Sequence, residues 1–116
     1  MFGLNDTYSY YIYPHYIDMG KGIEGLSELA RSKHNGNITN NNVYLFFGQQ
    51  KSQIKILKWD KDGFVLYQKR LEKGTFEVPR FKSQEDLIQI KWEAFIMIMR
   101  GVPLRNLRFR ERFKMP

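Results

Sequence analysis

The sequence lacks cysteine altogether and contains only two histidines, His15 and His34. Without cysteine it can form neither a disulfide framework nor a thiolate metal site, and two histidines are too few for a zinc centre unless carboxylates complete it. No apolar run approaches the roughly 18 residues that a membrane-spanning helix requires. The N-terminal residues also lack the basic and then apolar plan of a signal peptide. We therefore expect a cytoplasmic protein with no metal, no cofactor and no membrane contact.

The residues that are present describe one folded unit. A chain of 116 residues has room for one domain with one core. Apolar residues make up 42% of it and aromatic residues 16%, which excludes a mainly disordered chain. The sequence predicts a single domain over residues 1–103, followed by a basic C-terminal arm over residues 104–116.

The positive charge is concentrated in two segments. Residues 51–73 carry seven basic and three acidic side chains, and residues 100–116 carry six and one, so their net charges are +4 and +5. Residues 1–50 and 74–99 each carry −1, which gives the total of +7. Clustered positive charge attracts polyanions such as nucleic acid or acidic protein surfaces. The alternative is a solvated cationic face that only aids solubility.

The central stretch predicts three antiparallel strands, at Val43–Phe47, Gln53–Trp59 and Phe64–Leu71. Asp60–Gly63 has the composition of a tight hairpin turn, with glycine expected to supply a positive φ, and Gly74 ends the third strand in the same way. Lysine and arginine alternate with apolar residues along these strands. We therefore expect a sheet with one apolar face and one cationic face.

The flanking segments predict one more strand and two helices. The strand is Tyr8–Tyr13, which Pro14 ends or confines to an edge, and its tyrosines serve either as packing or as a stacking platform for bases. Asp18 is the expected N-cap of an amphipathic helix from Met19 to Lys33. A second, largely apolar helix is expected from its cap at Ser83 to about Arg100.

Together these elements predict an α+β domain in which an antiparallel sheet of about four strands, flat or curled, packs against two helices. The expected order is strand, helix, three strands and helix, and the order of the strands within the sheet stays open. The arm Leu104–Pro116 alternates basic and apolar residues. It is either a further strand or an arm that becomes ordered on binding.

Two stretches resemble a known family, namely Asp18–Leu26 (DMGKGIEGL) and Ile54–Phe76 with its Trp-Asp-x-Asp-Gly and Leu-Glu-x-Gly patterns. The chain is similar to the TnpB, or Orf-two-like, accessory proteins of the insertion sequence 66 family. Arginine is usual in that family at Gly20 and at Gln49–Gln50, and both departures remove positive charge. The matching motif residues are Asp18, Lys21, Gly22, Trp59, Asp60, Asp62, Gly63, Leu71, Glu72 and Gly74.

The resemblance implies an accessory protein that is encoded beside a larger transposase, assists transposition and has no catalytic activity of its own. The acidic residues agree with that expectation, because each has a simpler structural explanation than metal binding. Asp60 and Asp62 suit a turn, and Glu24 and Glu28 lie one helical turn apart on a solvated face. We therefore expect neither an enzyme nor a metal site.

Two functional hypotheses remain. The first is DNA binding at the element ends, led by contacts to phosphates, with Trp59, Tyr67 or Phe109 available for stacking. The second is an adaptor that docks on the transposase or on another copy through a sheet edge or the helical stripe Ile96–Met99. The expected phosphate-binding residues are Lys55, Lys58, Lys69, Arg70 and Lys73 on the sheet and Arg105, Arg108, Arg110 and Arg112 on the arm.

Overall fold

A computed structural model describes residues 2–35, 37–81 and 85–101 of the chain. The predicted arm, Leu104–Pro116, and the predicted helix cap, Ser83, lie outside the described residues. The described elements are β1 (Ser9–Ile12), α1 (Ile23–Lys33), β2 (Asn42–Phe47), β3 (Gln53–Asp60), β4 (Gly63–Arg70), β5 (Ile88–Ile90) and α2 (Trp92–Met99).

The strands form one sheet in the order β4-β3-β2-β1-β5. β2, β3 and β4 are the predicted antiparallel meander, and β5 pairs antiparallel with β1. β1 and β2 are parallel, because the chain crosses back through α1 between them. The predicted α+β class is confirmed, although the sheet is mixed rather than wholly antiparallel and is open rather than curled.

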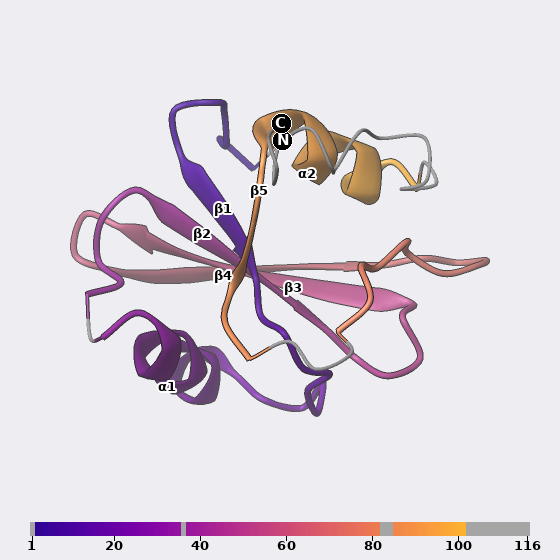
Figure 1. The fold of residues 1–116 in the computed structure, drawn as a ribbon, viewed down its shortest axis with the longest axis horizontal. Coiled ribbons are helices and arrows are strands. Elements are labelled where there is room, and N and C mark those ends of the chain that lie inside the picture. Colours follow the sequence, from indigo (N-terminus) through magenta and orange to yellow (C-terminus); the bar gives the residue numbers. More distant parts are fainter. Residues whose placement is uncertain (1, 36, 82–84, 102–116) are drawn as a thin grey trace.

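The two helices cover opposite faces of the sheet, α1 on one side and α2 on the other (Figure 1). Because successive residues of a strand point to opposite faces, β2 supplies both cores. Leu45 and Phe47 pack in the core beneath α2, and Tyr44 and Phe46 pack in the core beneath α1. This double coverage explains the five consecutive apolar residues in β2.

Helix α1 begins later than the sequence predicts. Asp18 is not its N-cap, because the Asp18 side chain accepts a hydrogen bond from the amide of Gly20 at 2.9 Å in a turn that precedes the helix. The N-cap is Gly22, which has extended backbone angles and no side chain to cap with. The expected start at Met19 is therefore wrong, and α1 runs from Ile23.

The second helix is also shorter than predicted, because its expected first half contains β5. Ile88 and Ile90 alternate with Gln89, and Ile90 lies opposite Tyr10 of β1. Helix α2 starts only at Trp92. Of the stripe Ile96–Met99, the last two residues are buried against the sheet and the first two are half-buried.

The tyrosines of β1 pack inside the domain. Tyr10 is 1% exposed, stacks on Phe95 with ring centroids 4.6 Å apart, and donates a hydrogen bond to the carbonyl of Asn5 at 2.6 Å. Tyr11 is half-buried on the other face beside His34 and Tyr44. Of the two roles expected for this strand, the described structure shows packing.

The hairpin between β3 and β4 has the predicted position, with Asp60 paired to Gly63. The positive φ lies at Lys61, at 56°, and not at Gly63 as expected. Gly74 does have a positive φ, at 77°.

The described helices have 11 and 8 residues, and neither is long and apolar enough to cross a membrane.

Candidate functional site

The lysines and arginines predicted to share one face of the sheet are divided between its two faces. Adjacent strand residues point in opposite directions, so Lys69 and Arg70 lie on different faces. Lys69 is paired with Ile54 beneath α2, and Lys58 lies on that same face. Arg70 and Lys55 lie on the face that α1 covers. The expected single cationic face is therefore not formed.

Lys55 is enclosed by the protein, with an exposed fraction of only 6%. Its ammonium group donates a hydrogen bond to the backbone carbonyl of Lys21 at 2.8 Å. This bond holds the segment before α1 against β3. Lys55 consequently has little surface left to offer a phosphate.

Lys69 and Lys58 are each engaged within the domain on the α2 side. Lys69 donates to the carbonyl of Met99 at 2.9 Å, where a cation complements the C-terminal end of the helix. Lys58 donates to the carbonyl of Trp59 at 3.1 Å and lies 4.8 Å from the ring centroid of Tyr8. Both side chains are half-buried, so each presents part of its charge to solvent.

Arg70 and Lys73 are exposed at the end of β4. Within the described ranges, neither side chain makes a hydrogen bond or an ion pair with another residue. Lys51 lies nearby in the loop between β2 and β3, because the amide of Phe76 donates to the carbonyl of Lys51 at 2.7 Å. These three cations form what we call the basic end of the sheet.

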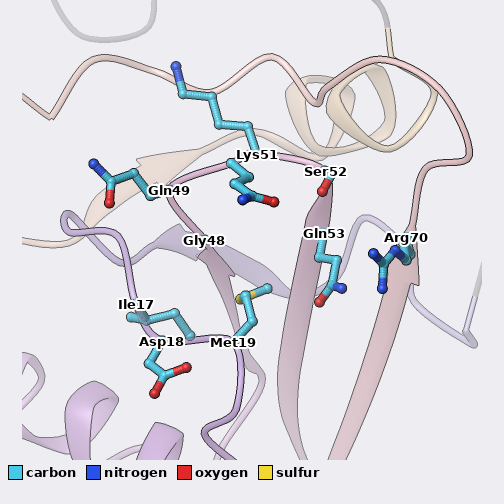
Figure 2. A pocket seen from close by; sticks show the side chains of 10 residues that line it. Ile17, Asp18, Met19, Gly48, Gln49, Lys51, Ser52, Gln53 and Arg70 are labelled. Carbon is cyan, nitrogen blue, oxygen red and sulfur yellow. The ribbon is translucent and has the colours of Figure 1, made fainter.

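A pocket of about 360 Å³ opens at the basic end. Figure 2 shows Asp18 and Arg70 on opposite sides of it, with Gln53 between them and Lys51 extending outward. Most of the lining is polar. The lining residues are Ile17, Asp18, Met19, Gly48, Gln49, Gln50, Lys51, Ser52, Gln53 and Arg70.

Strand direction explains why these segments meet. β1, β2 and β4 run in the same direction, since β1 is parallel to β2 and two antiparallel steps lead from β2 to β4. Their carboxyl ends therefore lie at one end of the sheet, as do the loops that follow them. The amide of Ile17 donates to the carbonyl of Phe47 at 2.9 Å and joins the first two loops directly.

The pocket floor depends on a glycine. A Cβ added at Gly48 would lie 2.6 Å from Cγ of Met19, a distance that real Cβ atoms do not tolerate. A larger residue at position 48 would therefore require the Met19 side chain to move away from the loop after β2.

The family motif residues fall into two groups in the structure. Asp18 lines the pocket, Lys21 and Gly22 lie between it and α1, and Leu71, Glu72 and Gly74 follow Arg70. The second group consists of Trp59, Asp60, Asp62 and Gly63 and lies at the other end of the β3–β4 hairpin. Seven residues of strand separate the two ends, which corresponds to about 23 Å. There the Trp59 ring packs edge-on against Phe64 with centroids 5.0 Å apart.

Of the predicted phosphate-binding residues, the structure therefore gathers Arg70 and Lys73 at the basic end and keeps Lys58 apart from them. The arm residues Arg105, Arg108, Arg110 and Arg112 lie outside the described part of the chain. No set of three or more His, Cys, Asp or Glu residues suited to a metal comes together in residues 2–35, 37–81 and 85–101.

Sequence reasoning misses the neutral side of the pocket, which Gln49, Gln50, Ser52 and Gln53 form. Uncharged polar residues in a loop carry no pattern of their own. The strand–helix–strand order is the feature of the sequence that indicates where the pocket lies. Such a crossover makes β1 and β2 parallel and brings the loops that follow them together.

Comparison with known proteins places most of the chain in one described family. A family model described as "IS66 Orf2 like protein" matches residues 8–109, which is 102 of the 116 residues. The match includes each described strand and helix and both groups of motif residues. No curated protein and no solved structure matches the chain.

Proposed function

Because the chain belongs to the family of IS66 Orf2-like proteins, accessory proteins of a transposable element, we propose that it assists transposition by binding DNA of the element ends at the basic end of the sheet. The chain contributes phosphate contacts and carries out no chemical step. The family assignment confirms the resemblance seen in the sequence. The proposal concerns the partner, DNA.

The observation that carries the proposal is the placement of three cations whose side chains make no hydrogen bond or ion pair with another described residue, although Lys51 lies 5.8 Å from the ring centroid of Tyr16. Lys51, from the loop after β2, and Arg70, from the end of β4, line one polar pocket, and Lys73 follows Arg70 by three residues. Lys55 and Lys69 donate hydrogen bonds to backbone carbonyls of a loop and a helix end, whereas Arg70 and Lys73 are exposed and Lys51 is half-buried without such a bond from its side chain. Cations in this arrangement neutralise successive backbone phosphates.

The contacts are expected to position the protein rather than to read bases. The exposed face of α1 carries Glu24 and Glu28 as well as Arg31, and α2 is a short apolar helix against the sheet. Neither is a basic helix suited to the major groove. The amides of Gln49 and Gln50 add neutral donors and acceptors at the pocket rim. Binding should therefore depend weakly on sequence and strongly on salt.

The test is the salt dependence of binding to duplex DNA from the element ends. If the basic end and the arm together neutralise roughly six phosphates, log K falls against log salt with a slope of about −5. Binding is measured by fluorescence anisotropy between about 50 and 200 mM salt, the interval over which such contacts lose most of their affinity. Absence of binding at the low-salt limit would overturn the proposal.

Single substitutions separate the basic end from general positive charge. Arg70→Ala should reduce the magnitude of the slope by about one, because one phosphate contact is lost. Arg31→Ala, which removes another exposed cation, on α1, should leave the slope unchanged. Equal losses for the two variants would mean that only net charge matters. A combined alanine variant of Arg105, Arg108, Arg110 and Arg112 measures the contribution of the arm.

A second candidate function is the adaptor that docks on the element's transposase. The outer edge of β4 favours it: among the described residues no strand pairs with that edge, and such an edge is a common way to bind another chain. Co-purification with the transposase from nuclease-treated lysate supports this role. Recovery of the transposase only when DNA is intact supports the DNA-binding role instead.

A further inference from the structure

In the part of the chain that the structure describes, strand β4 forms one edge of the sheet, and most of its length lacks the usual protection of an edge strand. It pairs with β3 over eight consecutive residues without a bulge, and it contains no proline. From Gly63 to Gln68 it also carries no charged side chain. Natural sheets normally blunt such edges with charges, prolines, bulges or short strands, and the opposite edge, β5, has only three residues.

The backbone groups that β4 presents outward can be identified. The amide of Leu71 donates to the carbonyl of Ser52 at 2.9 Å, so Leu71 faces β3. Because antiparallel pairs alternate, odd-numbered residues of β4 face β3 and even-numbered residues face outward. The outward amides are those of Phe64, Leu66, Gln68 and Arg70. Within residues 2–35, 37–81 and 85–101, no backbone hydrogen bond reaches them.

The side chains along this edge are apolar and incompletely covered. Phe64 and Leu66 on the α1 side and Val65 and Tyr67 on the α2 side are all half-buried. A strand added to β4 would therefore satisfy the outward amides and cover apolar surface on both faces of the sheet at once.

We propose that the occupant of this edge is β4 of a second copy of the chain, paired antiparallel. Charge supports this choice, because the two ends of β4 are of opposite sign. The turn at one end carries Asp60, Lys61 and Asp62, with a net charge of −1, and the other end carries Lys69 and Arg70. Antiparallel pairing of two identical strands places the acidic end of each copy beside the basic end of the other.

Strand geometry then selects the register. A two-fold axis perpendicular to the sheet keeps equivalent faces on the same side, so residues that pair across the interface are both even or both odd. Two registers pair seven residues of each strand, one centred on Leu66 and one on Tyr67. The first places Asp62 opposite Arg70 of the second copy, whereas the second places Asp62 opposite Glu72 of the second copy. Only the first register places side chains of opposite charge in opposition, and the interface is therefore centred on Leu66.

The result is a continuous sheet of ten strands, five from each copy, which is within the range of open sheets. The interface shares one residue, Arg70, with the lining of the pocket. Its formation is tested without DNA, whereas DNA binding is tested by its salt dependence, so the two proposals can fail separately.

The experiment is sedimentation equilibrium of the full chain without nucleic acid. The parent chain should show a monomer–dimer equilibrium. Asp62→Arg and Arg70→Asp should each weaken association about tenfold, because symmetry converts two attractive pairs into two repulsive ones. The double variant Asp62→Arg with Arg70→Asp restores opposite charges and should recover most of the affinity. Its recovery distinguishes a specific pair from a change in net charge.

The matched controls are Glu24→Arg and Arg31→Glu, which make the same charge changes on the exposed face of α1 and should leave association unchanged. In the parent chain, hydrogen exchange at the Leu66 amide should slow as protein concentration rises. A chain that stays monomeric at every concentration overturns the proposal. So does a double variant as weak as the singles, or a Leu66 amide that is fully protected in the monomer.

Discussion

At the scale of single residues, the pocket depends on the contact between Gly48 and Met19. A Cβ at position 48 would lie 2.6 Å from Cγ of Met19 and 3.3 Å from its sulfur. Gly48→Ala should therefore lower the free energy of unfolding by about 1–3 kcal/mol, the usual cost of overpacking. Chemical denaturation of the variant and the parent chain measures the difference.

Two further variants test the cause of that loss. In the double variant Gly48→Ala with Met19→Ala the clash is removed, so the two effects should be strongly non-additive. Gly63→Ala is the matched control, because nothing lies within 4 Å of its added Cβ and its φ is not positive. Additive effects, or an equal loss for Gly63→Ala, would contradict the steric explanation.

A second prediction at this scale concerns the buried hydroxyl of Tyr44. Burial raises the pKa of Tyr44 to about 12, while its oxygen lies 2.5 Å from Nδ1 of His34 and accepts a hydrogen bond from Asn42 at 3.1 Å. The unfolded chain loses this proton near pH 10, before the folded chain does. Rising pH therefore favours unfolding between about pH 10 and 12, with a slope of at most about 1.4 kcal/mol per pH unit from this group.

Tyr44→Phe removes this titration. The variant should be less stable than the parent chain at pH 8 by about 1 kcal/mol, because its hydrogen bonds are lost. Above pH 10, however, its free energy of unfolding should fall less steeply. Urea unfolding between pH 8 and 11 checks both parts. Parallel curves for the two chains over the whole range would show that Tyr44 does not titrate differently in the folded state.

At the scale of whole elements, the sequence predicts correctly those elements in which the apolar residues follow one repeat throughout. β2, β3 and β4 lie within a residue or two of their predicted positions, because Gly and Asp mark their ends. The run that contains β5 and α2 is apolar almost throughout, so its change from period two to period 3.6 at Lys91 leaves little trace. Which helix covers which face is not predictable from either pattern, since it depends on the crossover between β1 and β2.

The boundary between β5 and α2 gives a prediction of its own. Lys91 is the N-cap of α2, has extended backbone angles and makes no capping bond with its side chain, although its carbonyl accepts the amide of Phe95 at 3.0 Å. A short side-chain acceptor should improve this end. Lys91→Ser is therefore expected to be more stable than Lys91→Ala by about 1 kcal/mol.

The comparison with alanine matters because both variants remove the positive charge from the N-terminal end of the helix, where a cation is unfavourable. Any difference in stability between the two variants therefore measures the effect of the capping side chain. Thermal unfolding followed by circular dichroism is sufficient to measure it. Equal stability would mean that the amides at the start of α2 already have partners.

At the scale of the whole molecule, the distribution of charge along the sequence was predictable, but the position of each charge on the folded surface was not. The excess of positive charge in residues 51–73 is plain in the sequence. Its division between two faces follows from alternation along β4, and its partial use inside the domain follows from Lys55 and Lys69 reaching backbone carbonyls. Only the folded arrangement shows that Lys51, Arg70 and Lys73 remain available at one end.

The proposed pairing of β4 also fixes distances across the whole assembly. The chain has no cysteine, so a single Lys61→Cys variant takes one spin label at the turn between β3 and β4. Pairing centred on Leu66 separates position 61 from its copy by ten residues of strand, or about 33 Å, whereas pairing centred on Tyr67 separates them by twelve, or about 40 Å. Double electron–electron resonance resolves these two distances. Asp62 meets Arg70 of the second copy only in the first register, so a distance near 40 Å would contradict the electrostatic reason for the pairing. If no distance between labels is detected at any protein concentration, the pairing itself is contradicted.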